Sequence, residues 1–383
     1  MSPFKPRILI FIDWFLPGYK AGGPVQSCVN MMEHLKGEFD FYVITRNIDY
    51  CEVQPYESII SDSWTKTNTY LQVYYASNRR LTYTALAKAA LDAKPDIIFI
   101  NGIYSLYYSI FPLLISRKFN DVKVIVSARG MLAPSAIDVK GGKKKLFLQM
   151  AKALGFYRHV CFHATNNTEE LHIRNLFGQN QQVKIAPNLP KIYTLSFSGL
   201  SKQTGMLRLA SVARISPEKN TKYALQVLHE YTFDGNIVFD IFGPVYDEAY
   251  WTECVELINS LPGNIQVNYR GSIEHTKVTE TLQQYHALFL PTRGENFGHI
   301  IFESLTAGRP VVISDQTPWR SLEEHNIGFD IPLNNPAAFA ESLQIMLNQT
   351  QEEYDMLTNA AYLYAQQVSQ DKQAVELNRL LFR

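Results

Sequence analysis

Two carboxylates stand eight positions apart in the stretch GENFGHIIFE, residues 294–303. Gly298 precedes an apolar run that predicts a helix, so the backbone N–H groups near residues 296–299 would be open to an anion such as a phosphate. Glu303 would lie in this helix, and Glu295 in the loop before it. Because carboxylates accept hydrogen bonds from hydroxyl groups and repel phosphate, a phosphate flanked by two polyols, as in a nucleotide sugar, fits this combination.

A second loop, ARISPEKN, carries cations at the end of an apolar run. Ser216 and Pro217 predict an N-cap and the first residue of a helix, which would place Lys219 in the first turn. A cation at that position is unfavourable beside the helix dipole unless an anion compensates it. Arg214 and Lys219 could together neutralise a diphosphate and stabilise it as a leaving group, whereas surface ion pairs, for example to Glu218, are the alternative.

Two loops in the first half also follow predicted strands. Gly22 and Gly23 would let the backbone approach a ligand, and Pro24 suits the first turn of a helix, although a plain tight connection explains the same residues. The pattern is not the G-x-G-x-x-G fingerprint, which disfavours a nicotinamide enzyme. Arg129 follows another strand and would reach the same ligand.

Lysine and apolar residues alternate between residues 140 and 158. This pattern predicts a basic amphipathic helix suited to an anionic membrane surface or a lipid-linked acceptor. A solvated helix with an ordinary core face is the alternative. The residues concerned are Lys140, Lys143, Lys144, Lys145, Lys152 and Arg158, with Leu146, Phe147, Met150 and Leu154 among them.

Length and composition set the broad class of protein. The chain has 383 residues, of which 46% are hydrophobic, so two domains with real cores are expected. Its zero net charge divides into +8 for residues 1–187 (22 Lys+Arg against 14 Asp+Glu) and −8 for the remainder (14 against 22), which suggests that the first half faces something anionic. Neither a secretory signal nor a membrane span is evident, and four scattered cysteines disfavour zinc or disulfides. A cytoplasmic location is expected.

Apolar runs alternate with helical patterns along both halves, which predicts an α/β protein with two doubly wound parallel sheets. The expected strands are RILIFI, FDFYVIT, LQVYYA, DIIFI, VKVIVSA, VCFHAT and VKIAP, then LRLASVA, IVFDIFG, IQVNYRG, ALFLP and PVVISD. The polar, proline-broken segment 186–205 marks the join. Ligands of such sheets bind beyond the carboxyl ends of the strands, so a cleft between facing domains is the expected site.

These motifs carry a family resemblance. RGENFGHIIFESLTAGRPVVISD resembles the Glu, seven residues, Glu motif of family-four retaining glycosyltransferases of GT-B fold, and SVARISPEKN is similar to that family's phosphate-binding segment. GGP and ARGMLAPSAI match as well and are similar to segments of bacterial sugar transferases that build surface polysaccharides. The resemblance implies two Rossmann-like domains facing a central cleft: 1–187 on the acceptor and membrane side, 188–365 binding the nucleotide sugar, and a C-terminal helix in 366–383 crossing back.

The resemblance also implies roles for individual residues. Glu303 would hold the ribose and Glu295 the donor sugar, while Arg214 and Lys219 would bind the diphosphate. The backbone of Asn296, Phe297 and Gly298 would line the sugar and phosphate, Gly22 and Gly23 would approach the diphosphate, and Arg129 would stand where many relatives place a histidine.

The implied reaction is transfer with retention of configuration from a nucleotide-diphosphate sugar to a glycan or lipid-linked acceptor. No Asp-x-Asp pair occurs in the chain, so no metal or other cofactor is expected. A nucleotide-sugar epimerase, a phosphorylase, or a non-catalytic scaffold on the same fold are the alternatives. The enzyme would work in the cytoplasm, at the inner membrane face, with no nucleic-acid partner.

Overall fold

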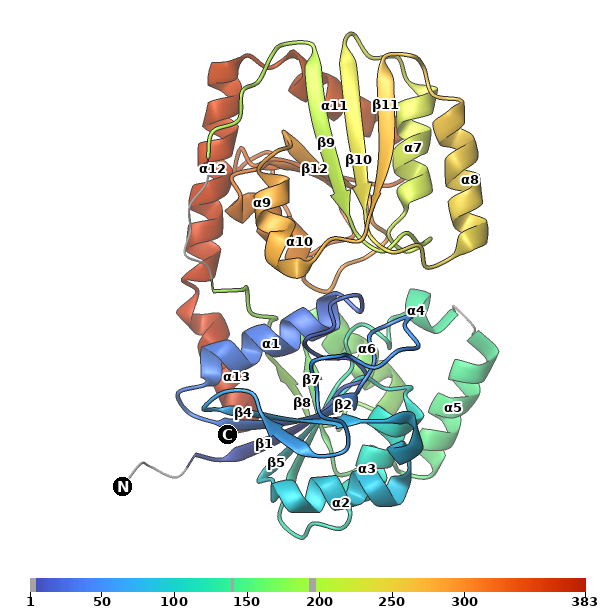
Figure 1. Ribbon diagram of the computed structural model, residues 1–383, viewed down its shortest axis with the longest axis vertical. Helices are drawn as coiled ribbons and strands as arrows, with labels where there is room; N and C mark the ends of the chain where they lie inside the picture. Colours follow the sequence, from blue (N-terminus) through green and yellow to red (C-terminus); the bar gives the residue numbers. More distant parts are fainter. Residues whose placement is uncertain (1–4, 139–140, 193–197) are drawn as a thin grey trace. The chain divides into compact units, whose positions relative to one another are not determined.

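The computed structural model describes residues 5–138, 141–192 and 198–383 (Figure 1). They form two compact units: unit 1 comprises the chain up to Ile192 together with Lys372–Arg383, and unit 2 comprises Tyr193–Asp371. The division therefore falls a few residues beyond the 187/188 and 365/366 boundaries expected from the sequence.

Unit 1 contains an eight-stranded sheet of order β3-β4-β2-β1-β5-β6-β7-β8, in which only β3 runs antiparallel to its neighbour. The strands are β1 (Arg7–Phe11), β2 (Asp40–Arg46), β3 (Trp64–Lys66), β4 (Leu71–Ala76), β5 (Ile97–Asn101), β6 (Lys123–Ser127), β7 (Cys161–Ala164) and β8 (Val183–Ile185). The helices are α1 (Gly23–Leu35), α2 (Tyr83–Ala93), α3 (Phe111–Ser116), α4 (Pro134–Asp138), α5 (Gly141–Ala153), α6 (Asn167–Phe177) and α13 (Lys372–Phe382), with short helical turns η1 (Asn78–Arg80) and η2 (Leu106–Ile110).

Unit 2 contains a fully parallel six-stranded sheet of order β11-β10-β9-β12-β13-β14. The strands are β9 (Met206–Val212), β10 (Asn236–Phe242), β11 (Ile265–Gly271), β12 (Ala287–Leu290), β13 (Val311–Ser314) and β14 (Gly328–Ile331). The helices are α7 (Thr221–Glu230), α8 (Glu248–Asn259), α9 (Val278–Leu282), α10 (His299–Thr306), α11 (Pro336–Asn348) and α12 (Gln351–Ser369), with the turn η3 (His275–Lys277).

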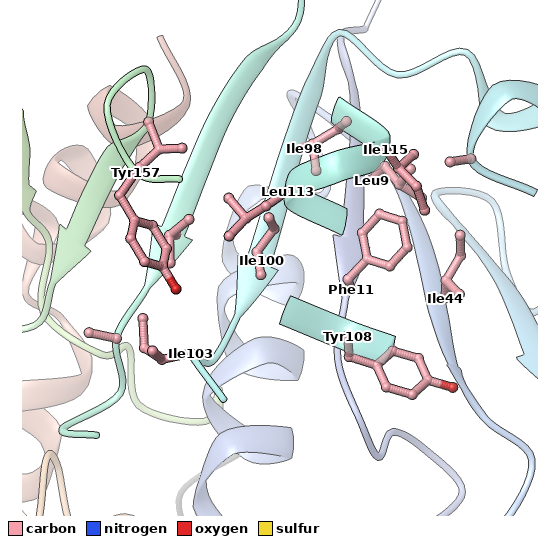
Figure 2. Close-up of a cluster of buried hydrophobic side chains, with 14 of the residues drawn as sticks. Leu9, Phe11, Ile44, Ile98, Ile100, Ile103, Tyr108, Leu113, Ile115 and Tyr157 are labelled. Carbon is pink, nitrogen blue, oxygen red and sulfur yellow. The ribbon is translucent and has the colours of Figure 1, made fainter. Parts of the chain in front are cut away.

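Both faces of each sheet are buried, because side chains along a strand alternate between two cores. In β1, Leu9 and Phe11 enter the core shown in Figure 2, whereas Ile8 and Ile10 enter the core on the opposite face. Helices α2, α3 and α6 contribute to the first of these cores, and α1 and α13 to the second (Figure 1). This two-sided burial explains why the strands read as continuous apolar runs in the sequence.

The C-terminal helix α13 belongs to the core of unit 1. Phe382 packs its ring 5.6 Å from that of Phe39 and 5.7 Å from that of Phe99. Lys123 donates a hydrogen bond of 2.9 Å to the carbonyl of Leu381, and Lys184 one of 2.6 Å to that of Leu380. Cations at the end of a helix satisfy its last carbonyls and its dipole, so the sheet of unit 1 fixes α13 by both packing and charge.

Candidate nucleotide-sugar site

The strand order of unit 2 places a topological switch point at the neighbouring strands β9 and β12. The chain builds the sheet outward through β10 and β11 and then returns to the other side of β9 with β12, so the connections after β9 and β12 leave in opposite directions. Ligands of open parallel sheets bind at such a switch point, beyond the carboxyl ends of the strands. Both of the motif-bearing loops identified in the sequence of this half, 213–220 and 291–298, start there.

These two loops are joined by hydrogen bonds to each other's backbone carbonyls. The N–H of Arg293 donates to the carbonyl of Glu218 at 2.8 Å, and the hydroxyl of Thr292 donates to the same oxygen at 3.1 Å. The buried amide of Asn220 donates to the carbonyl of Pro291 at 2.9 Å. The loops therefore act as one rigid platform, as a preorganised site requires.

The platform brings Lys219 against Glu295. Their ammonium and carboxylate groups are 2.5 Å apart, although 76 positions separate them in the sequence. Both side chains are mostly buried, with 19% and 12% of their surface exposed. A cation and an anion that remain partly accessible can bind different parts of one ligand, the cation a phosphate and the anion a hydroxyl.

Arg214 occupies the first of the two loops, and the segment after β10 positions it. Its guanidinium carbon lies 5.6 Å from the ring centroid of Tyr246. The N–H of Ile215 donates to the carbonyl of Pro244, and that of Tyr246 donates to Ile215 in return. Gly243 has a φ of 140°, and a Cβ there would stand 1.9 Å from the carbonyl oxygen of Ala213, so only glycine allows this close approach.

Helix α10 holds Glu303 and presents its amino end at the switch point. Its N-cap is Gly298, with a φ of 76°, and no side chain caps it. Within the described residues, the N–H groups of Asn296, Phe297 and Gly298 donate no hydrogen bond, which leaves them available to an anion. Glu303 is buried, and His275 of η3 lies 3.6 Å from its carboxylate.

One expectation about this site is wrong. Ser216 does not cap a helix, because residues 217–220 form turns and α7 begins only at Thr221, with Asn220 as its N-cap at a φ of 61°. Ser216 is instead buried, and its carbonyl accepts the N–H groups of Lys219 and Asn220. Lys219 therefore precedes α7 by two residues rather than lying in its first turn.

Unit 1 has a switch point of its own between β1 and β5, which the analysis of the sequence missed. Asp13 follows β1, and its carboxylate accepts a hydrogen bond of 2.8 Å from Ser105, which follows β5. Burial raises the pKa of the Asp13 carboxyl, and the hydrogen bond from Ser105 and the charge of Arg46 oppose this only in part. A polar residue directly after the run ILIFI was the signal that could have identified Asp13.

Aromatic rings surround this cluster. The guanidinium carbon of Arg46 lies 5.9 Å from the ring centroid of Trp14 and 5.6 Å from that of Tyr107, and both rings are partly exposed. Arg46 also approaches Asp13 at 3.4 Å. A carboxylate and a guanidinium beside aromatic faces can bind a polyhydroxylated ligand, since the rings cover its C–H faces and the charges its hydroxyl groups.

The other three predicted site residues also lie in unit 1. Gly22 is the N-cap of α1, with a φ of 71°, and both Gly22 and Gly23 are exposed, with open space where a Cβ would be. Arg129, with a φ of 52°, donates hydrogen bonds to Asn101 at 2.6 Å and to Asn188 at 2.5 Å. Burial lowers the pKa of its guanidinium. Much of its donor capacity is thus used inside unit 1, and its contact with a donor remains a prediction.

Comparison with known proteins finds similar sequences for the part of the chain that forms this site. Residues 196–364 match the family model of glycosyl transferases group 1, and this range contains both loops and the whole of α10. This part of the chain is similar to group 1 glycosyltransferases. Over 160 residues it is 27% identical to the alpha-D-kanosaminyltransferase of Streptomyces kanamyceticus, which covers 41% of this chain and 41% of that enzyme.

Solved structures are similar to both units of the chain. Sucrose-phosphate synthase from Thermosynechococcus elongatus has a TM-score of 0.71 at 15% identity and covers 99% of each chain. Anabaena HepE, solved in complex with UDP-glucose, has a TM-score of 0.65 at 14% identity and covers 98% of each chain. Two Rossmann-like parallel-sheet domains of the GT-B class are thereby confirmed.

Proposed function

We propose that this protein is a retaining glycosyltransferase that moves a sugar from a nucleotide-diphosphate sugar to a glycan or lipid-linked acceptor in bacterial polysaccharide synthesis. The observation that carries the proposal is the Lys219–Glu295 pair, held at 2.5 Å by two interlocked loops at the switch point of unit 2. The pair sets a cation suited to phosphate beside a carboxylate suited to hydroxyl groups, within the residues that match the group 1 family model.

Each group around the pair takes one part of the donor. Lys219 and Arg214 bind the diphosphate, and Glu295 accepts hydrogen bonds from the transferred sugar. Glu303 holds the ribose, while the available N–H groups of residues 296–298 bind phosphate and sugar oxygens. For Gly22, Gly23 and Arg129 of unit 1, contact with the donor stays a prediction.

The reaction follows from this distribution of charge. The bond between the anomeric carbon and the diphosphate oxygen breaks, and the acceptor hydroxyl attacks from the same face, which retains the configuration. The departing phosphate takes the hydroxyl proton. Because Arg214 and Lys219 already balance the negative charge that develops on the diphosphate, the reaction proceeds without a metal.

The cluster at the switch point of unit 1 suits the acceptor. Asp13 accepts hydrogen bonds from acceptor hydroxyl groups, and Trp14 and Tyr107 supply ring faces for the sugar. A cytoplasmic enzyme acting peripherally at the inner membrane face is consistent with a lipid-linked acceptor. Among the described residues, no helix is long and apolar enough to cross a membrane.

Two substitutions test the donor assignment. Lys219→Ala is expected to weaken binding of the nucleotide diphosphate and to lower turnover about 100-fold, since it removes charge stabilisation from the leaving group. Glu295→Gln is expected to lower turnover more than nucleotide binding, because it weakens the contacts with the sugar while its amide oxygen can still accept a hydrogen bond from Lys219. Isothermal titration with nucleotide diphosphates in metal-free buffer, together with sugar-transfer rates, measures both effects.

A nearby ion pair supplies matched controls. Lys222 and Glu253 also form a Lys–Glu pair, at 2.6 Å, but on the exposed surface of α7 and α8. Lys222→Ala and Glu253→Gln should leave binding and turnover unchanged. If the site variants and the control variants behaved alike, the assignment of Lys219 and Glu295 would be wrong.

A further inference from the structure

Helix α5 has two apolar faces, only one of which the protein covers. Leu148 and Ala151 are buried in the core of unit 1, and Phe147 packs against the same core. On the other side, Leu146 and Met150 are 58% and 53% exposed, and Leu154, one residue beyond the helix, is 61% exposed. Spacings of four residues place these three side chains on one side of the helix. Figure 1 shows α5 at the rim of unit 1.

The charges around the exposed face are all of one sign. Lys143, Lys145 and Lys152 are exposed on α5, as is Arg158 just beyond it. From Val139 to Thr168 the sequence contains six Lys and Arg residues and no Asp or Glu. Such one-sided charge around apolar side chains complements an anionic surface rather than a neutral one.

A neighbouring element extends the positive charge. Arg117, exposed at the end of α3, holds its guanidinium carbon 5.8 Å from the ring centroid of Phe156, which follows α5. Lys144 plays a different part from the one its sequence position suggests. It donates a 2.6 Å hydrogen bond to the carbonyl of Ala136 and lies 5.3 Å from the ring of Tyr104, so it braces α5 against the rest of unit 1.

We infer that the exposed face of α5, formed by Leu146, Met150 and Leu154 with Lys143, Lys145 and Lys152, docks on the surface of an anionic lipid bilayer. The three apolar side chains enter the boundary between headgroups and acyl chains, and the lysine stems extend along it with their ammonium groups at the acidic headgroups. Helix α5 then lies in the plane of the membrane surface and does not cross it. None of these residues belongs to the proposed donor site, so the inference stands apart from the reaction assigned above.

Sedimentation of the full chain with lipid vesicles tests the inference. The wild-type protein should bind vesicles that contain phosphatidylglycerol and should not bind pure phosphatidylcholine vesicles. Binding should weaken at about 1 M salt, where the screening length falls to about 3 Å. Replacing Lys145 and Lys152 by Gln should lower the affinity by about fivefold for each lysine removed.

The apolar contribution needs a control of equal charge. Leu146→Glu with Met150→Glu should abolish binding to the anionic vesicles. Met356→Glu with Leu363→Glu places the same charges at side chains of α12 that are equally exposed, at 55% and 56%, and should leave vesicle binding intact. A thermal-shift response to nucleotide diphosphates, measured without vesicles, should be the same in wild type and in both double variants.

Two results would overturn the inference. One is a wild-type protein that ignores anionic vesicles, which would leave this face to a protein partner or to none. The other is equal loss of binding in the α5 and α12 double variants, which would show that added negative charge acts wherever it is placed. In both cases the thermal-shift response would still report on the donor site, so the two proposals fail separately.

Discussion

At the scale of single residues, the site in unit 2 depends on an ion pair that the sequence could suggest only in part. Residue type and position after a strand marked Glu295 and Lys219 as candidates. Their meeting at 2.5 Å could not be predicted from the sequence, because 76 positions separate them. The loops are joined by hydrogen bonds from the Arg293 N–H to Glu218 and from the Asn220 side chain to Pro291, and both acceptors are backbone carbonyls, which every residue type carries. His275 lies beside Glu303 through a contact between distant segments, which the sequence also did not reveal.

The Asp13→Asn substitution is expected to affect activity and stability in different ways. Asp13→Asn should lower kcat/KM for the acceptor by about 10- to 100-fold, because a hydrogen bond to a charged group is worth about 1.5–3 kcal/mol. Affinity for the nucleotide should not change. Steady-state kinetics with varied acceptor, and titration of the nucleotide, separate the two.

The thermal midpoint of the same variant tests the electrostatics. Burial raises the pKa of Asp13, so its folded form favours the protonated acid. The associated stability is full below the ordinary pKa of 3.8 and is lost as pH rises through the raised value. At neutral pH the buried, ionised carboxylate therefore destabilises the fold, and Asn removes this charge. The thermal midpoint of the Asp13→Asn variant should not fall below that of the wild type. A lower midpoint would show that the bonds to Ser105 and Arg46 outweigh burial.

At the scale of elements, the apolar runs predicted all twelve strands that they marked, and both glycine-led helix starts, at α1 and α10, are confirmed. Two short edge strands were missed. β3 has three residues with a lysine among them, and β14 includes a glycine and an aspartate, so neither forms an apolar run. The start of α7 was misplaced because Ser-Pro suits a turn as well as a helix.

Two buried histidines form hydrogen bonds that connect a sheet to the chain segment just before or after it. His163 of β7 donates from Nε2 to the carbonyl of Ala186 at 2.7 Å, and His286, just before β12, donates to that of Ser201 at 3.1 Å. The Nδ1 of His286 accepts the N–H of Arg208 at 2.9 Å, which requires an unprotonated nitrogen. Burial lowers the pKa of both rings to about 4.

This arrangement predicts a loss of stability in mild acid. A histidine with a lowered folded pKa stabilises the fold fully above its ordinary pKa of 6.5, and this stability is lost as pH falls towards 4. Protonation of each histidine should lower the free energy of unfolding by about 1.4 kcal/mol per pH unit within that window. Asp240, whose pKa is lowered, affects stability only below its ordinary 3.8. Denaturant unfolding between pH 7.5 and 5 measures the slope.

Glutamine substitutions assign this slope to the two rings. His286→Gln and His163→Gln should each flatten the dependence on pH, whatever they do to stability at neutral pH. Equal slopes in all the proteins would trace the acid sensitivity to other groups.

At the scale of the whole molecule, the chain passes from unit 1 to unit 2 after Ile192 and returns after Asp371. The return places α13 in the core of unit 1, where Leu381 is fully buried beside the half-exposed Leu380. Neighbouring leucines of one helix thus differ only in burial. This difference isolates the contribution of α13 to the stability of unit 1.

Leu381→Ala should destabilise unit 1 by about 2–5 kcal/mol, because it removes a buried side chain and leaves a cavity. Leu380 is 46% exposed in the wild type, so Leu380→Ala should lower the free energy of unfolding by well under half as much. Hydrogen exchange measured by mass spectrometry should become faster in peptides of unit 1, and its rate should not change in peptides from residues 198–371. Equal effects from the two leucines, or faster exchange in both units, would contradict this role for α13.

The separation of α13 from the rest of unit 1 along the chain also bears on synthesis at the ribosome. The rings of Phe39 and Phe99 are made before unit 2, whereas their partner Phe382 is made after it. The apolar surface of unit 1 that packs against α13 therefore stays uncovered while the whole of unit 2 is translated. Chaperones recognise such a surface, and aggregation exploits it.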